Sequence, residues 1–284
     1  MKLLFALIVP CYVIGQSPQA APPRTWSNIT TLSYVSVSGN SSVDTIGFSN
    51  DFTKKWHLTT LTIKGNMIHS ESIVSSLTAI GNSLDDVVVQ KASTDLIVAE
   101  NYSLNARLDY QLKDKHRWYW YGGSSWTRNL PVGLNARTTA TAGIGRIIIS
   151  AAKTNWRLDA GLGITREEPT YLPAGFQKNF GTFNLSGSFK HQFNGNINYN
   201  ADLNSAFNVK KTNDWLFTIK QGLTVTLTSH TALKVGLDIN YKNAPNLILV
   251  RVYTSYDPPV SIGSIILESK KVDTLATTSL VVTY

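Results

Sequence analysis

The most constraining feature of this sequence is a two-residue periodicity, clearest in DWLFTIKQGLTVTLTSHTALKVGLDINY, residues 214–241. On both sides of a turn at Ser229 and His230, nearly every second residue from Trp215 to Tyr241 is apolar. A period of two predicts β-strands, because successive side chains of a strand point to opposite faces. Two such runs joined by a short turn predict an antiparallel hairpin. The alternation alone does not decide which face meets water.

Similar runs cover most of the chain, and helical periodicity is not sustained anywhere. The pattern predicts an all-β fold of about twelve strands, near residues 27–37, 43–53, 56–68, 94–112, 116–128, 136–149, 156–167, 180–192, 197–208, 214–228, 231–243 and 273–284. Residues 247–267, around Asp257-Pro258-Pro259, could add a hairpin and leave the count open between 12 and 14.

The N-terminal segment has the pattern of an export signal. Lys2 precedes an apolar stretch from Leu3 to Ile14 that is too short to span a bilayer. We therefore expect a signal peptide at residues 1–20, a periplasmic linker at 21–26 and the folded domain at 27–284. Cys11 is the only cysteine, so the exported domain would hold no disulfide and no thiolate metal site.

The connections between the predicted strands alternate in length. Short ones are Thr53–Lys55, Lys113–Lys115, Ala151–Asn155, Asn194–Asn196 and Thr228–His230. Those between them are mostly longer: 69–93, 129–135, 168–179, 209–213 and 244–272, with Gly39–Ser42 short. Short turns at one end and longer loops at the other are typical of a bacterial outer-membrane barrel. We therefore predict a closed antiparallel transmembrane β-barrel of meander topology, with both termini on the periplasmic side.

The tryptophans favour the same interpretation. Amphipathic indoles concentrate at the two edges of a bilayer, where one part is apolar and the N–H meets water. We expect a membrane-interface girdle made of Trp26, Trp56, Trp118 and Trp156 at the short-turn edge and of Trp126 and Trp215 at the opposite edge.

In such a barrel the apolar face meets lipid, and the polar face lines the lumen. Charges within the apolar runs are then tolerated because they point inward. The predicted lumen-facing residues are Arg107, Asp109, Arg157, Asp159, Lys220, Lys234, Asp238 and Asn240. They could form a salt-bridged ladder that plugs the interior or line a pore. Twelve strands lie between a filled barrel of about eight and an open one of sixteen, so size leaves this undecided.

A secreted soluble β-sandwich binding module would show the same alternation with the faces reversed. The turn lengths, the export signal and the C-terminus favour the barrel. Leu280, Val282 and Tyr284 are spaced by two and end in an aromatic residue, which resembles the signal that the outer-membrane assembly machinery recognises.

Several segments resemble the YdiY-like family of salt-induced outer-membrane proteins, which are grouped under domain of unknown function 481. The segments are SVSGNSSVDTIGFS, ENYSLNARLDYQLKDKHRWYWYGGSSW, ARTTATAGIGRIII, WRLDAGLGITREE and KKVDTLATTSLVVTY, and the resemblance extends from about Ser27 to Tyr284. It implies an outer-membrane barrel and no reaction. The chain departs from the family in longer excursions at 73–93 and 244–272.

No motif of catalysis, metal binding or cofactor binding stands out, and we expect neither a catalytic residue nor a cofactor. His57, His116, His191 and His230 are scattered over separate hairpins beside short turns. His69, in NMIHSES, is the one candidate for an envelope-lipid-modifying enzyme, but neighbouring serines on a strand would point to the opposite face. We expect it to start a loop.

The formal net charge of +8 is spread over turns and loops, which does not suggest a nucleic-acid footprint. The expected partners are outer-membrane lipids and lipopolysaccharide, through loop cations at Arg128, Arg137, Arg166, Lys178, Lys210, Lys211, Lys270 and Lys271. The sequence thus predicts a monomeric protein in the outer membrane of a Gram-negative bacterium, serving as a narrow channel or in envelope integrity.

Overall fold

The computed structural model describes residues 25–37, 41–81, 87–113, 117–173, 175–253 and 261–283. The predicted signal peptide therefore lies outside the described residues. The chain forms strands throughout: β1 (Trp26–Val37), β2 (Ser41–Trp56), β3 (Thr59–Gly81), β4 (Val87–Gln111), β5 (Trp118–Asn129), β6 (Leu134–Ser150), β7 (Thr154–Pro169), β8 (Asn179–Gln192), β9 (Ile197–Asn208), β10 (Trp215–Thr226), β11 (Thr231–Lys242), β12 (Leu247–Tyr253), β13 (Ser261–Glu268) and β14 (Val272–Thr283).

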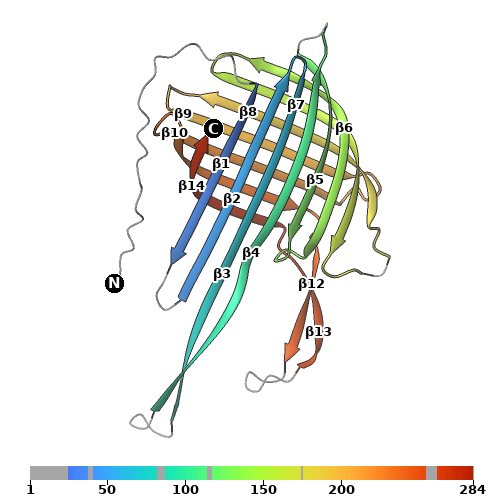
Figure 1. Cartoon of the computed structure of the whole chain (residues 1–284). Helices are drawn as coiled ribbons and strands as arrows, with labels where there is room; N and C mark the ends of the chain where they lie inside the picture. Colours follow the sequence, from blue (N-terminus) through green and yellow to red (C-terminus); the bar gives the residue numbers. More distant parts are fainter. Residues whose placement is uncertain are drawn as a thin grey trace.

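Twelve of these strands close into one antiparallel barrel in the order β1-β14-β11-β10-β9-β8-β7-β6-β5-β4-β3-β2 (Figure 1). Each strand pairs with its neighbour in sequence, except that β12 and β13 form a separate two-stranded sheet between β11 and β14. The predicted closed meander of twelve strands is confirmed, and the count of fourteen barrel strands is wrong. The pairing of β1 with β14 closes the wall and excludes a two-sheet sandwich.

The outer face of the barrel is apolar. Leu104 and Leu108 of β4 are half exposed, and Leu162 and Ile164 of β7 are 68% and 70% exposed. Their sequence neighbours face inward and are polar or small, as the alternation predicts. Large apolar side chains exposed all around a closed barrel are the arrangement of a wall in contact with lipid. Within the described ranges there is no helix long and apolar enough to cross a bilayer.

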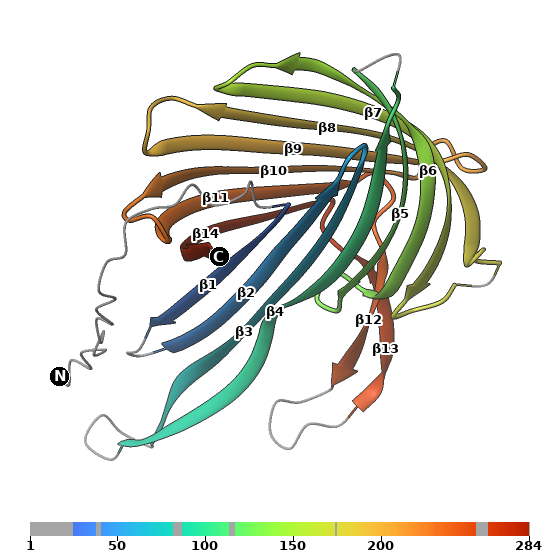
Figure 2. The same cartoon turned by 45° about the horizontal axis from the view of Figure 1, so that its top comes forward.

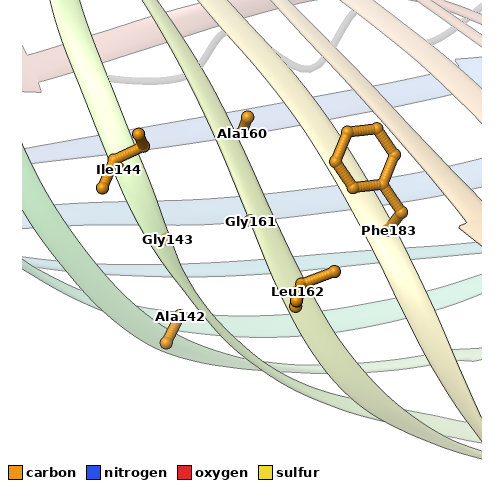
Figure 3. Close-up of a pocket in the computed structure, with 7 residues that line it drawn as sticks. All are labelled: Ala142, Gly143, Ile144, Ala160, Gly161, Leu162 and Phe183. Carbon is orange, nitrogen blue, oxygen red and sulfur yellow. The ribbon is translucent and has the colours of Figure 1, made fainter.

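The wall is thin where β6, β7 and β8 run side by side. Ala142 and Ala160 face outward there, between the larger Ile144, Leu162 and Phe183, and leave a shallow apolar groove of about 260 Å³ (Figure 3). Gly143 and Gly161, the neighbouring glycines of these strands, face the lumen. The outward alanines form the groove, and the inward glycines make room for side chains that lie against this wall from inside.

Two connections differ from the expectation. The predicted loop 69–93 is largely a continuation of β3 and β4, which stay paired from Thr59–Tyr110 out to Gly81–Val87 and project beyond the barrel (Figures 1 and 2). The predicted turn Thr53–Lys55 is wrong, since β2 stays paired up to Trp56–Thr59 and turns at His57 and Leu58. In both cases the hydrogen-bonded ladder continues after the apolar alternation has faded, because backbone pairing does not depend on side-chain polarity.

The β12–β13 hairpin projects at the same end as the β3–β4 extension (Figure 2). Asn246, just before β12, accepts a backbone hydrogen bond from Ser269 at 2.9 Å and donates its side-chain amide to the carbonyl of Val132 at 3.2 Å. The base of the hairpin is therefore tied to the β5–β6 connection at the same end of the barrel. Gly133 of this connection has φ of 75°, a conformation that favours glycine. A side chain at this position would also press against Asn246 and Ile248.

The β1–β14 seam is the shortest pairing in the wall. Among the described residues it has four residue pairs, from Ile29–Thr283 to Leu32–Leu280, whereas every other barrel pairing has between eleven and twenty-three. Beyond Leu32, β1 remains paired with β2, and β14 remains paired with β11. The seam is thus closed in its short-turn half and unpaired in its loop half.

Hydrogen exchange should reveal this asymmetry. Unpaired strand edges lose protection through local opening, so we expect amides of Ser33–Val37 and Leu275–Ser279 to exchange faster than those of β6 and β7. The measurement is peptide-resolved hydrogen–deuterium exchange of the folded barrel in lipid nanodiscs. Equal protection of the seam and of the β6–β7 ladder would contradict a partly unpaired seam.

Candidate functional site

The lumen is crossed at mid-barrel by an ion pair between opposite walls. Lys64 Nζ on β3 lies 3.7 Å from Asp202 Oδ2 on β9, and 4.0 Å from Asp51 Oδ2 on the adjacent β2. In the ring of twelve strands, β3 and β9 are six positions apart in either direction, so they are diametrically opposed. We call Lys64, Asp51 and Asp202 the central bridge. Two side chains can meet in this way only where the barrel is narrowed between these walls.

A second set of lumen contacts, the wall cluster, lies along β4 to β8. Arg107 donates its Nε to Asp109 at 2.7 Å, and its Nη1 and Nη2 to both oxygens of Asp159 at 3.1 and 2.9 Å. Arg157 donates to Asp109 at 3.3 Å, and Ser186 donates to Asp159 at 3.0 Å. Arg107 on β4 and Asp159 on β7 are three strands apart in the wall, so their side chains meet over the intervening β5 and β6.

Glycines and tyrosines make this approach possible. A Cβ added at Gly145 or Gly143 on β6 would collide with the rings of Tyr119 and Tyr121 on β5, which shows that both rings lie flat on the glycine-lined wall. The Arg107 guanidinium lies over the Tyr121 ring, 4.0 Å from its centroid. The Tyr119 hydroxyl donates to Asp159. The cluster is therefore a packed polar layer that fills one side of the lumen.

A third set, the mouth cluster, lies near the loop end. Glu167 on β7 accepts hydrogen bonds from Arg137 on β6 at 2.5 and 2.8 Å and from Lys242 on β11 at 2.7 Å. Lys242 also donates to Asn246 at 2.5 Å, so the cluster is continuous with the base of the β12–β13 hairpin. Since β7 and β11 are four strands apart, this contact also crosses the lumen.

The structure brings together six of the eight residues predicted to face the lumen, four of them in the wall cluster and two in a separate ion pair. Arg107, Asp109, Arg157 and Asp159 belong to the wall cluster, and Lys220 on β10 pairs with Asp238 on β11 at 3.4 Å. Asn240 accepts a hydrogen bond from the Thr218 hydroxyl at 2.9 Å. Lys234 lies against Gly222 of the adjacent β10, without a carboxylate within 4.0 Å among the described residues. Contacts within the barrel are therefore described for all eight of these residues.

The tryptophans occupy strand ends. Trp26 begins β1, Trp56 ends β2, Trp118 begins β5 and Trp156 lies near the start of β7, all at the short-turn end. Trp126 and Trp215 lie toward the loop end, where Trp215 packs against Tyr241 with ring centroids 4.9 Å apart. Trp120 was not among the residues predicted for the girdle, but it is 57% exposed. The alternation in WYWY puts it on the same face as Trp118. Their role at a membrane interface stays a prediction.

In β14, Leu280 pairs with Leu32 and Leu233, and Val282 pairs with Thr30 and Thr231, so both residues belong to the closed part of the seam. Tyr284 lies outside the described residues. Recognition of this strand by the assembly machinery stays a prediction.

His69 is within β3, not at the start of a loop, because the β3–β4 ladder extends past it. Its Nε2 lies 3.0 Å from Glu71 Oε1, while Ser70 and Ser72 are buried and Ser70 bonds to Thr45 at 2.7 Å. Histidine and serines thus face opposite ways, which does not assemble a nucleophile with its base. Among the described residues, no three histidines, cysteines or carboxylates converge as metal ligands.

The residues that close the lumen were not predicted from the sequence. Arg137 was expected on an outer loop, but it lies in β6 and turns inward to Glu167. Arg128 and Arg166 are also in strands, β5 and β7. The alternation predicts that Lys64 and Asp202 face inward, since each follows an outward apolar residue. No local sequence pattern predicts that their side chains meet. The glycines of TAGIGRI and DAGLGIT, paired on adjacent strands, were the available signal for the tyrosine layer.

Solved structures of barrels are similar to this chain over most of their length. A structure titled NanC porin has 9% identity and a TM-score of 0.42, with 90% of this chain and 97% of that chain covered. An anion-selective porin from Comamonas acidovorans has 8% identity and a TM-score of 0.38, with 92% and 99% covered. The CymD monoaromatic hydrocarbon channel has 9% identity and a TM-score of 0.37, with 91% and 87% covered.

No curated protein matches the sequence. A family model described as protein of unknown function, DUF481, matches residues 30–247, which span most of the barrel, and the chain therefore belongs to this family.

Proposed function

We propose that this protein is a narrow, water-filled channel of the outer membrane for small hydrophilic solutes, with its bore set by the central bridge. The observation that carries the proposal is the ion pair between Lys64 and Asp202 on opposite strands. A lumen lined by both signs of charge suits ions and polar solutes and is unsuited to an apolar filling. Both chain ends would then lie in the periplasm, with the loops outside.

The exposure of the charged groups separates a movable constriction from fixed packing. Lys64 and Asp202 are 47% and 30% exposed, so water competes for their contact and the pair is weak. Asp159 in the wall cluster is only 3% exposed, and it accepts hydrogen bonds from Arg107, Tyr119 and Ser186. We assign the central bridge to control of the bore and the wall cluster to the rigidity of the wall.

The lumen also carries cations that have no paired carboxylate. Lys190 on β8 and Lys234 on β11 face inward by their register with Asn200 and Ser279, and neither lies within 4.0 Å of a carboxylate in the described residues. Fixed positive charge in a narrow pore concentrates anions and repels cations. We therefore assign the channel a modest preference for small anions.

A structural role in envelope integrity is the second candidate. The observation that favours it is that three separate sets of contacts cross or fill the lumen, at its middle, along its wall and at its mouth. A barrel closed in this way would stabilise the membrane without conducting. Exposed lysines at the loop end, among them Lys210, Lys211 and Lys270, would serve either role by binding lipopolysaccharide phosphates.

Removing the bridging lysine should widen the bore. We expect Lys64→Ala to raise the single-channel conductance in a planar bilayer by about twofold, because the longest side chain of the constriction is lost. The matched control is Lys54→Ala on the neighbouring β2, whose side chain lies on the outer face in register with Trp26. If neither the folded wild type nor Lys64→Ala conducts, the channel proposal is contradicted and the structural role remains.

Neutralising the unpaired lysines should change selectivity. For Lys190→Gln combined with Lys234→Gln we expect the chloride-to-potassium permeability ratio to fall by about twofold, since two fixed positive charges leave the lumen. The reversal potential in a potassium chloride gradient measures this ratio. An unchanged ratio, or the same fall in Lys54→Gln, would contradict an effect of lumen charge.

The wall cluster should contribute more to stability than an exposed pair. Asp159→Ala leaves the largely buried Arg107 guanidinium, whose side chain is 17% exposed, without its bidentate partner, and we expect a loss of about 3 kcal/mol in the free energy of unfolding. Asp238→Ala removes a pair whose lysine is 46% exposed and should cost less than about 1 kcal/mol. Urea unfolding in lipid vesicles, followed by tryptophan fluorescence, compares the two; equal losses would contradict the assignment.

A further inference from the structure

The unpaired half of the β1–β14 seam is an exception to the rule that governs the rest of the wall. Strands in a bilayer must pair their backbone groups, because lipid offers them no partner. All other wall strands are paired over at least eleven residues on both edges. Residues 33–37 of β1 and 275–279 of β14, although each is in a strand, do not pair with one another.

A cavity lies at this place, beside the unpaired strand edges. It measures about 60 Å³ and is lined by Ser33, Val35, Thr45, Gly47, Ile68, Leu275, Ala276, Thr277 and Thr278. The lining residues of β1, β2 and β3 face the lumen, as do Leu275 and Thr277. Ala276 and Thr278, by contrast, face outward with Leu280. The cavity therefore touches both the lumen side and the lipid side of β14.

The chemistry of the lining is amphipathic. Val35, Ile68 and Leu275 supply apolar surface, whereas Ser33 and the threonines supply hydroxyls that can bond to otherwise unpaired groups. Gly47 contributes no side chain, and the Ser33 hydroxyl lies over it. A slot of this volume has the room of about two water molecules, so only a thin segment of a ligand, such as a short length of one hydrocarbon chain, can occupy it at a time.

We propose that the loop half of the β1–β14 seam is a lateral portal that takes the hydrocarbon chain of a single-chain amphiphile between the lumen and the bilayer. The hydroxyls of the lining then meet the polar end of the amphiphile, and the outer band of the barrel meets its chain. This activity goes beyond conduction of hydrophilic solutes, and its test does not depend on conductance.

The test uses the folded barrel in lipid vesicles with a palmitate that carries a photoactivatable diazirine in its chain. After irradiation, mass spectrometry maps the labelled residues. We expect labelling concentrated in Ser33–Val37 and Leu275–Ser279 and reduced several-fold by unlabelled palmitate. Uniform labelling around the apolar band, without competition, would mean ordinary boundary lipid and would overturn the portal.

Filling the slot gives the second arm of the test. Ala276→Trp should reduce seam labelling several-fold, whereas the matched control Ala106→Trp, on the outer face of the fully paired β4, should not. Thr278→Phe serves the same purpose if Ala276→Trp does not reach the folded gel mobility. Unchanged labelling in a folded slot-filled variant overturns the proposal. So does native mass spectrometry that finds the seam occupied by a second copy of the chain.

Discussion

The structure depends on closing a ladder of backbone hydrogen bonds in a medium that offers no substitute partner. A strand that leaves this ladder in lipid carries unsatisfied N–H and C=O groups, so the strands continue until the barrel closes. Closure then fixes the rest of the arrangement. The outward positions within the bilayer are then largely apolar, and the charges in the middle of the strands are directed to the lumen, where water and opposite charges are available. The lysines and aspartates that interrupt the apolar runs follow from this constraint.

Twelve strands enclose more space than the inward side chains fill evenly, and the chain divides that space unevenly. On one side, glycines of β6 and β7 let Tyr119 and Tyr121 lie against the wall, and the charged groups of the wall cluster form a layer on that side, with the Arg107 guanidinium over the Tyr121 ring. On the other side, Lys64 reaches the opposite wall at Asp202. The buried layer is costly to disrupt, because a lost partner leaves a charge without water. The central bridge is less costly to disrupt, because water reaches its charges. The wall cluster is therefore rigid, and the central bridge can be displaced.

The periodicity of the sequence predicted the strands and their inward and outward faces well, because both are set by neighbours two residues apart. The predicted inward direction holds even for Lys220 and Asp238, which interrupt apolar runs and pair with each other. The periodicity failed at the β3–β4 extension, where serine-rich residues dilute the alternation but backbone pairing continues. It also could not predict that Lys64 meets Asp202 or that Lys242 meets Glu167. Such contacts depend on the cross-section of the closed barrel, which no local pattern encodes. Only the paired glycines hinted that side chains would lie flat on one wall.

The departures from a regular barrel gather at its last strand. The β12–β13 hairpin is inserted between β11 and β14, and its base is tied to Val132 and, through Lys242, to Glu167. The strand that follows, β14, is held over eleven pairs by β11 and over only four by β1. Because β14 has the fewest residue pairs of the twelve barrel strands, it is the barrel strand whose displacement would disturb the least backbone pairing. A barrel with one loosely held closing strand combines a rigid wall, where the charges are buried, with a single line along which that wall can part.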